Sequence, residues 1–545
     1  MKMTRWQWLL LGAIGFGALA LRVLDHSRIF LWVDETGFFN EDVYGSHPKG
    51  LVDYAWGLKQ DPTTTNTWAW PGLMWLSCRL FGGTIGAARI PFIMIGAAAV
   101  PMTFWLIYSL IPAACGRRRF VASAIGAILA SITIEQIDFS QRVFPYAATP
   151  FSTCAVLLAH MKVLRINEAA GTDRAELLRA VALYIVAGIW ALCTHPSMAL
   201  LLGVSTIFLA GSAAANFQQL SRDERVLRIW LAVATAAAFG AAVLLNTKNP
   251  DSGRHDYLAS YYHSLSIRGF GKLLFHVYDL ATYHLNLFYD PSLYWPERLN
   301  LVLLPLALLC FAGWAASAFG RFGEHAKRFA LLSSAMIAAP AILSLNRFRL
   351  FPFGGVRQTL FLSPLLFVFC ALGLGWLLSF RQLRIAGLIL GAAYLSLWGI
   401  KLPRFYSDRL RPYEPEDIVR VWRENGELPF YSTHGNMELT YAVRDYPEIR
   451  FMKTKYLAFP DPTTSYFLIE TRAPLGDPDW LPGLAEHYQR AGQHVELLTS
   501  RPAKHPHNPP SYFGSTYFPP SGLWIYKISP DSSIPGPGAL TIRTP

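Results

Sequence analysis

Long apolar runs recur along most of the first 400 residues of this chain. A membrane-spanning helix needs about 20 apolar residues, or roughly 17 to 25 with tilt. Such runs are too many for one soluble core in a chain of 545 residues that is 52% hydrophobic and only 15% charged. The sequence therefore predicts about eleven transmembrane helices, at roughly residues 6–24, 88–111, 119–135, 146–163, 179–194, 196–214, 228–246, 299–318, 329–346, 358–379 and 384–400.

The loop charges predict the orientation of the chain. Cytoplasmic loops usually hold an excess of Lys and Arg, and here the excess follows the second, fourth, sixth, eighth and tenth predicted spans. This placement accounts for the net charge of +12 without a nucleic-acid partner. The N-terminus is therefore expected in the cytoplasm, with a first helix that is retained, and an odd number of spans places everything after Leu402 outside. The residues concerned are Arg117, Arg118, Arg119, Lys162, Arg165, Arg174, Arg179, Arg222, Arg225, Arg228, Arg321, Lys327, Arg328, Arg381 and Arg384.

Two regions differ from the apolar runs. Residues 25–87, the first extracytoplasmic loop, turn amphipathic at 71–81, which predicts helices on the membrane surface. Residues 401–545 alternate strand-like and helical patterns, so we expect a small extracytoplasmic α/β domain after a membrane domain of residues 1–400. Its strands are predicted at 429–433, 466–472, 494–499 and 523–528, and its helices at 436–446 and 478–492.

An acidic pair, Asp34 and Glu35, directly follows the first predicted span and an aromatic, apolar approach. A carboxylate at the membrane surface can deprotonate an acceptor hydroxyl or hold a metal ion. The pair can equally begin a surface helix, with Asp34 as its N-cap and Glu35 in its first turn. Both interpretations stay open on these residues alone.

Three arginines, Arg347, Arg349 and Arg357, lie in an outer connection where the positive-inside rule predicts few. They surround a segment rich in glycine and proline, which permits close backbone approach. Planar guanidinium groups suit a phosphate at the interface. The alternative is that these side chains extend to lipid headgroups.

Two other outer turns carry polar candidates. Arg142 and Tyr146 lie in the turn between the third and fourth spans, and His195 lies between the fifth and sixth. All three belong to the face that carries the arginines. A lone interfacial histidine is more often a satisfied hydrogen-bonding group than a catalyst, so His195 supports both interpretations.

Short motifs follow one another in a characteristic order between residue 5 and about residue 400. After the acidic pair, the segments are 71–76, 80–83, 88–91, 140–146, 194–196 and 351–362. In this order they resemble membrane glycosyltransferases of the GT-C superfamily. The closest resemblance is to the bacterial protein-mannosyltransferase-like group, which includes the lipid A aminoarabinose transferase and the rhizobial core galacturonosyltransferases.

The resemblance implies an outer-face, inverting transfer of a hexose or pentose from a polyisoprenyl-phosphate donor to a lipid, glycan or protein acceptor. Asp34 would be the catalytic base, with Glu35 beside it. The arginines, with Arg142, Tyr146 and His195, would hold the donor phosphate. No metal site is expected, with a divalent cation at the acidic pair as the alternative. The resemblance also implies a bacterial inner membrane.

Two other functions remain open from the sequence. A transporter or flippase of lipid-linked sugars would use the same outer arginines, but it should carry charges near the bilayer midplane. A scaffold would use the C-terminal domain to bind a partner. Nucleotide-driven transport is not favoured, because no G-x-x-x-x-G-K-[ST] motif occurs.

Overall fold

The computed structural model places the described residues in two compact units. The first comprises Met1–Ser27, Glu41–Tyr289 and Pro296–Lys401, and the second comprises Arg28–Asn40, Asp290–Trp295 and Leu402–Pro545. The structure describes residues 3–29, 35, 39, 43, 49–54, 69–168, 174–215, 222–246, 270–286, 301–344, 357–407, 409–410, 414–432, 439, 443, 445–446, 448–449, 451–453, 464–470, 486, 488, 493–502 and 522–530.

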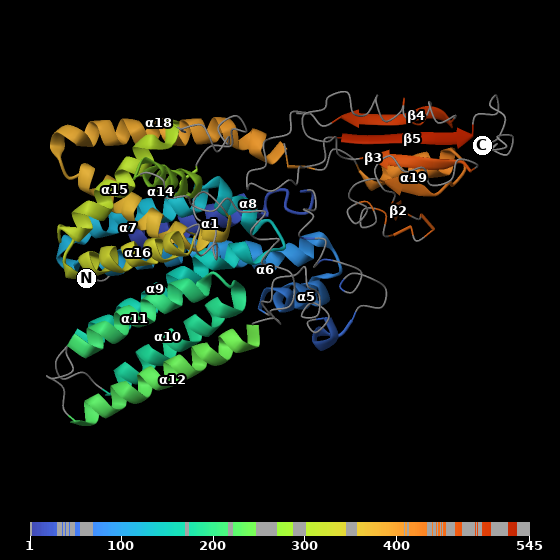
Figure 1. Ribbon diagram of the computed structural model, residues 1–545. Coiled ribbons are helices and arrows are strands. Elements are labelled where there is room, and N and C mark those ends of the chain that lie inside the picture. The colour runs from blue at the N-terminus through green and yellow to red at the C-terminus, as the bar shows by residue number, and fades with distance from the viewer. Residues whose placement is uncertain are drawn as a thin grey trace, which may run out of the picture. The chain divides into compact units, whose positions relative to one another are not determined.

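The first unit is helical (Figure 1). Its helices pack in long, nearly parallel pairs, among which α9 lies beside α10 and α11. The elements are α1 (Arg5–Val23), α5 (Ala69–Phe81), α6 (Ile85–Leu110), η1 (Ala113–Cys115), α7 (Gly116–Ile132), α8 (Ile134–Ser140), η2 (Pro145–Ala147), α9 (Ala148–Glu168), α10 (Arg174–Thr194), α11 (Met198–Ala215), α12 (Arg222–Asn246), α14 (Phe270–His284), η5 (Leu301–Leu303), α15 (Leu304–Ala318), α16 (Glu324–Leu343), η6 (Arg357–Leu362), α17 (Ser363–Leu377) and α18 (Arg381–Ser407).

Among the described residues, 9 helices are long and apolar enough to cross a membrane. The pair α7 and α8 would make a tenth span, bent by 56° at Thr133, and α15 is a shorter apolar helix. Each of the eleven segments predicted from the sequence overlaps one of these helices. The prediction of a mainly helical protein with several membrane-spanning segments is confirmed.

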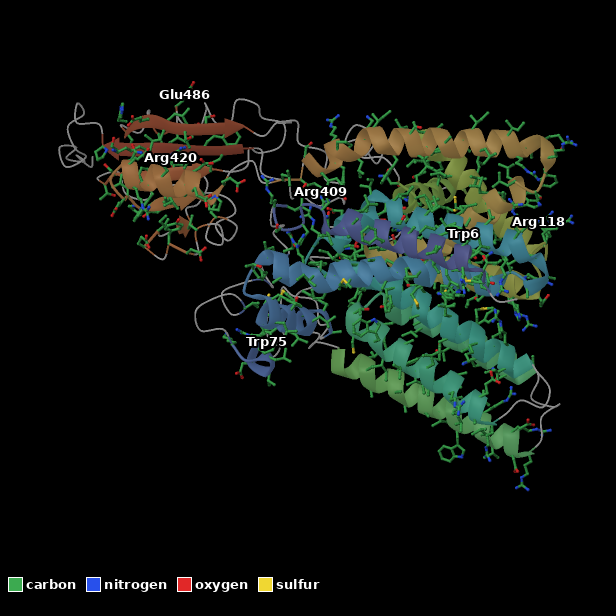
Figure 2. The ribbon with its side chains drawn as sticks, turned by 180° about the vertical axis from the view of Figure 1, so that it is seen from behind. Trp6, Trp75, Arg118, Arg409, Arg420 and Glu486 are labelled. Atoms are coloured by element: carbon green, nitrogen blue, oxygen red, sulfur yellow. The ribbon has the colours of Figure 1, made fainter. Side chains whose placement is uncertain are left out.

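Large apolar side chains cover the outer faces of these helices. On a soluble protein a continuous exposed apolar surface of this kind would be unfavourable, whereas lipid solvates it. Trp6, on the first turn of α1, is 80% exposed, and it lies at the same end of the bundle as Arg118 (Figure 2). Other members of this surface are Phe16, Val186, Ile207, Trp230, Phe311, Ile385, Ile389 and Ile400.

Two glycines bring α15 and α17 into direct backbone contact. A side chain on Gly313 would overlap the carbonyl oxygen of Phe369, and one on Gly373 would overlap that of Leu309. Small residues allow membrane helices to approach this closely, and van der Waals packing then holds them together. This contact fixes α17, and with it η6, which directly precedes α17.

The second unit contains a mixed five-stranded sheet in the order β2-β1-β3-β5-β4. Strand β1 is parallel to β2 and β3, whereas β5 is antiparallel to β3 and β4. The four predicted strands are confirmed, and β2 was not predicted. The predicted helices at 436–446 and 478–492 lie mostly outside the described residues. The elements are α19 (Pro415–Glu424), β1 (Phe430–Ser432), β2 (Phe451–Lys453), β3 (Tyr466–Glu470), β4 (Gln493–Pro502) and β5 (Gly522–Pro530).

Side chains of the sheet alternate between two buried clusters, as the pleat of a strand requires. Phe467 and Ile469 of β3 pack in one cluster with Trp422 of α19. Tyr466 and Leu468 pack in the other cluster. Because both faces of β3 are covered, this strand forms the centre of the unit.

The segment after α1 belongs to the second unit. Ile29 forms a β-bridge with Leu410, and Arg28 forms an exposed ion pair of 3.3 Å with Glu414. Glu414 precedes α19 and takes part in its capping box. An exposed ion pair contributes little stability, so the β-bridge is the stronger sign that this part of the first loop packs with the C-terminal residues.

Candidate functional site

The candidate site lies at the break between α7 and α8. The break interrupts an apolar span, so backbone groups on both sides of it lack helical hydrogen-bond partners and need others. The carbonyl oxygen of Ile132 accepts a hydrogen bond from the Trp398 indole at 2.9 Å. The amide of Ile134 donates to the carbonyl of Asn286 at 3.0 Å. Partners from distant parts of the chain therefore satisfy the backbone on both sides of the bend.

Arg22, at the end of α1, stabilises the end of α7. Its guanidinium is fully buried and donates to the carbonyls of Ala130 at 3.1 Å and Ser131 at 3.2 Å. Its Nε donates to the Ser140 hydroxyl at 3.1 Å. A cation is favourable here because a helix C-terminus carries partial negative charge. Arg22 thereby connects α1 to both halves of the broken span.

The side chain of Gln141, which follows α8, makes the reciprocal contact with the end of α1. Its amide donates to the carbonyls of Arg22 at 3.0 Å and Leu24 at 2.8 Å, at the end of α1. Gly96 of α6 leaves the space for Ser140, because a Cβ there would overlap the Ser140 hydroxyl. Arg22 of α1 thus satisfies carbonyls at the end of α7, and Gln141 at the end of α8 satisfies carbonyls at the end of α1.

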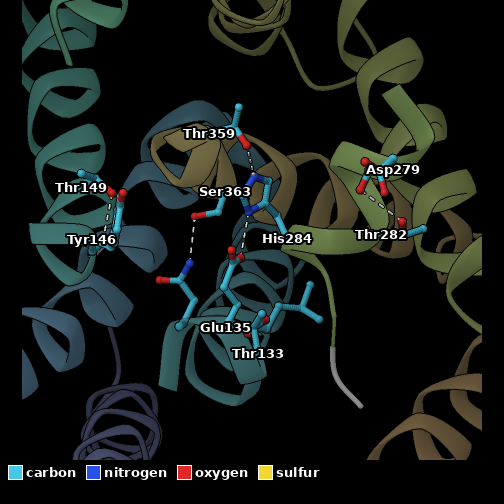
Figure 3. A network of polar contacts seen from close by, with 11 residues as sticks. Thr133, Glu135, Tyr146, Thr149, Asp279, Thr282, His284, Thr359 and Ser363 are labelled. Atoms are coloured by element: carbon cyan, nitrogen blue, oxygen red, sulfur yellow. Dashed lines mark hydrogen bonds and ion pairs between the residues drawn. The ribbon is translucent and has the colours of Figure 1, made fainter. Parts of the chain in front are cut away.

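The short helix α8 carries two buried carboxylates. Asp138 accepts an ion-paired hydrogen bond from Arg142 at 3.2 Å, and both side chains are 6% exposed. Glu135 lies 2.8 Å from Nδ1 of His284, whose Nε2 lies 2.9 Å from the Thr359 hydroxyl (Figure 3). These contacts connect α8 to the end of α14 and to η6.

An aromatic cluster lies next to α8. The Tyr146 ring in η2 stacks on Phe144 at 4.8 Å and is tilted against Phe139 at 5.0 Å and His195 at 5.3 Å. The Ser197 amide donates to Nδ1 of His195 at 3.2 Å. His195 is therefore held by its own turn, and its ring packs against a tyrosine that precedes α9.

The sequence-predicted residues are thus brought together only in part. Arg142, Tyr146 and His195 lie in one buried region of the first unit. Glu35 is fully buried in the second unit, and its carbonyl accepts a hydrogen bond from the Phe39 amide at 2.8 Å. Asp34, Arg347 and Arg349 lie outside the described residues, and Arg357 begins η6 with its backbone alone described.

Five polar residues of this site were not predicted from the sequence: Arg22, Glu135, Asp138, His284 and Thr359. Two carboxylates at the end of an apolar run were a usable signal, because ionisable residues near the membrane core are costly and usually functional. His284 and Thr359 carried no comparable local signal. Among the described residues, no group of three or more His, Cys, Asp or Glu side chains could hold a metal ion.

Several solved structures are similar to this chain. ArnT from Cupriavidus metallidurans in the apo state is 11% identical with a TM-score of 0.50, over 96% of this chain and 97% of that chain. The ArnT structure bound to undecaprenyl phosphate is 12% identical with a TM-score of 0.50, over 96% and 98%. The oligosaccharyltransferase AglB from Archaeoglobus fulgidus, in complex with an inhibitory peptide and a dolichol-phosphate, is 14% identical with a TM-score of 0.46, over 84% and 62%.

No model of a protein family matches this chain. No curated protein matches it in sequence either. The ArnT structures nevertheless share its architecture along nearly the whole length of both chains. The chain has the GT-C fold, as its sequence motifs predicted.

Proposed function

We propose that this protein is an integral membrane glycosyltransferase that moves a sugar from a polyisoprenyl-phosphate donor to a lipid, glycan or protein acceptor. The observation that carries the proposal is the GT-C fold shared with an ArnT structure that binds undecaprenyl phosphate. The buried polar groups of α8, η2 and η6 support it, because they gather where the broken span interrupts the apolar bundle. Because the proposed donor is a lipid phosphate, the proposed reaction requires no nucleotide-binding site.

The proposed reaction is a single displacement at the anomeric carbon. The acceptor oxygen forms the new glycosidic bond while the bond to the lipid phosphate breaks, so the configuration inverts. Asp34 takes the acceptor proton, and Glu35 lies beside it in sequence. Arginines neutralise the departing phosphate; Arg357, Arg347 and Arg349 are the candidates.

Arg142, Tyr146 and His195 complete the proposed donor site. Asp138 holds the Arg142 guanidinium in one orientation, which suits a planar group that binds a phosphate. The Tyr146 and His195 rings pack at 5.3 Å and give this part of the site a fixed shape. These three residues would bind the donor rather than carry out proton transfer.

Purified protein in liposomes tests this function directly. Polyisoprenyl-phosphate sugars extracted from bacterial membranes serve as donors, and mass spectrometry follows both the donor lipids and an added surface-glycan acceptor. We expect the donor to lose its sugar and the acceptor to gain one sugar mass. Movement of intact donor between leaflets without sugar loss would instead identify a transporter, and a donor that neither loses its sugar nor changes leaflet would refute both functions.

We further propose that the N-terminus is cytoplasmic and that the second unit is extracytoplasmic. The exposed residues Arg117 and Arg118 at the start of α7 support this orientation through the positive-inside rule. The orientation places α8, η2 and η6 on the outer side. A bacterial inner membrane is the proposed location.

Cysteine labelling is expected to test this orientation. Cys115 in η1 is exposed, so a membrane-impermeant maleimide should label it in inverted vesicles and leave it unlabelled in right-side-out vesicles. Burial raises the pKa of the Cys78 thiol to about 12, so Cys78 has almost no reactive thiolate at neutral pH. The experiment uses a Cys193→Ala background, with Cys115→Ala as control. Labelling of Cys115 only in right-side-out vesicles would show that the topology is the reverse of the proposed one.

A further inference from the structure

Three buried polar groups form a continuous chain across the first unit. The Glu135 carboxylate contacts Nδ1 of His284 at 2.8 Å, and Nε2 of His284 contacts the Thr359 hydroxyl at 2.9 Å (Figure 3). His284 and Thr359 are fully buried, and Glu135 is 2% exposed. Each nitrogen of the imidazole therefore has a defined partner in a region from which water is excluded.

This chain of contacts ends on η6, which other buried groups also hold. Gln136 of α8 donates to the Ser363 hydroxyl at 3.1 Å, directly after η6. Thr153 of α9 donates to the carbonyl of Phe361 at 2.9 Å. Helices α14 and α9 thus contact η6 directly, and α8 holds the residue that follows it; Arg357 is the first residue of η6.

We propose that Glu135 and His284 are positioning residues that fix η6, and with it the backbone of Arg357, through the hydroxyl of Thr359. The inference rests on the proposed function, in which Arg357 binds the donor phosphate. A carboxylate that accepts a hydrogen bond from Nδ1 fixes both the tautomer and the orientation of an imidazole. The hydroxyl of Thr359 then has one favourable position.

The order carboxylate, imidazole, hydroxyl also occurs in hydrolase triads, where the hydroxyl is the nucleophile. Burial argues against that role for Thr359, because a nucleophile must reach the substrate and this hydroxyl is fully buried. Burial favours a positioning role, because a hydrogen bond shielded from water is electrostatically strong and holds its two groups in one arrangement. The two roles make different predictions for substitutions at Thr359.

Replacing His284 by Gln or Asn tests its two hydrogen bonds one at a time. The Gln side chain places its amide near the position of the His Nε2 atom, and the Asn side chain places its amide near Nδ1. We expect His284→Gln to keep the contact with Thr359 and to retain more activity than His284→Asn. Thr359→Val should raise the KM for the donor and lower kcat/KM roughly tenfold, whereas Thr359→Ser should stay near wild type.

Thr282→Val is the matched control. Thr282 lies on α14 two residues before His284, and among the described residues its buried hydroxyl donates to carbonyls of its own helix, Tyr278 at 3.0 Å and Asp279 at 3.2 Å. This variant should leave the donor KM unchanged. Stabilisation of each variant against heating by undecaprenyl phosphate supplies a second readout: it should weaken in Thr359→Val and His284→Asn, and stay unchanged in Thr282→Val.

A double substitution completes the test. His284→Asn and Thr359→Val remove the same hydrogen bond, so the double variant should lose no more than about twofold beyond either single variant. Additive losses, or a donor KM in Thr359→Val equal to that of Thr282→Val, would overturn the inference while the proposed function stands. A sugar adduct on Thr359 would also overturn it, in favour of direct chemistry. A wild type that transfers no sugar refutes the proposed function itself.

Discussion

Asp34→Asn is expected to lower the turnover of sugar transfer by about 10³-fold, the range that a general base contributes. Asparagine has nearly the same shape and cannot accept the acceptor proton. The KM for the donor should change little, because Asp34 is proposed to act on the acceptor. Initial rates with a polyisoprenyl-phosphate sugar, measured on purified protein in liposomes, give both constants.

Asp53→Asn is the matched control for this substitution. Asp53 is an exposed carboxylate in the same first loop, so its loss should leave turnover near wild type. Glu35→Gln provides a second comparison, because Glu35 is fully buried and is proposed only to lie beside the base. If Asp34→Asn kept wild-type turnover and Glu35→Gln lost it, the assignment of Asp34 would be wrong and Glu35 would be the base.

Arg22→Leu is expected to destabilise the first unit by about 3 to 5 kcal/mol, because each buried carbonyl that loses its donor costs about 1 to 3 kcal/mol. Leucine fills similar volume but leaves the carbonyls of Ala130 and Ser131 without their donor. Water does not reach this depth to replace it. A large drop in the thermal midpoint in detergent, with low yield from membranes, is the measurable result.

Arg117→Leu is the comparison for Arg22→Leu, since Arg117 is exposed at the other end of α7. It should change the free energy of unfolding by no more than about 0.5 kcal/mol, the usual range for a surface substitution, and so should move the midpoint far less than Arg22→Leu does. Gly96→Ala tests the same junction from another side, because the added methyl group would displace Ser140 from Arg22. Equal midpoints for Arg22→Leu and Arg117→Leu would show that Arg22 does not hold the broken span.

The spans and the main strands could be predicted because their signals are local. A run of about 20 apolar residues is favourable in lipid whatever its neighbours are. The alternation in β3 and β5 likewise follows from residues two apart on one strand. Helix α19 was missed, although Glu414 and Pro415 mark its start, and β2 is too short for its alternation to be recognised.

The contacts of the site could not be predicted in this way. Glu135 is separated from His284 by 149 residues, and His284 from Thr359 by 75. No local pattern selects one such pairing among many. Tyr146 and His195 are in ring contact, as residues at neighbouring ends of spans can be from topology alone; the donor-binding role of Arg142, Tyr146 and His195 stays a prediction.

The sequence by itself determined that this chain crosses a membrane many times and that a mixed α/β region follows, since hydrophobic transfer and strand alternation act on each segment separately. Only the tertiary structure decided where α7 breaks and which polar groups meet there. Buried carbonyls and charges must find partners where water is absent, and here those partners are Arg22, Trp398 and Asn286, which come from distant segments.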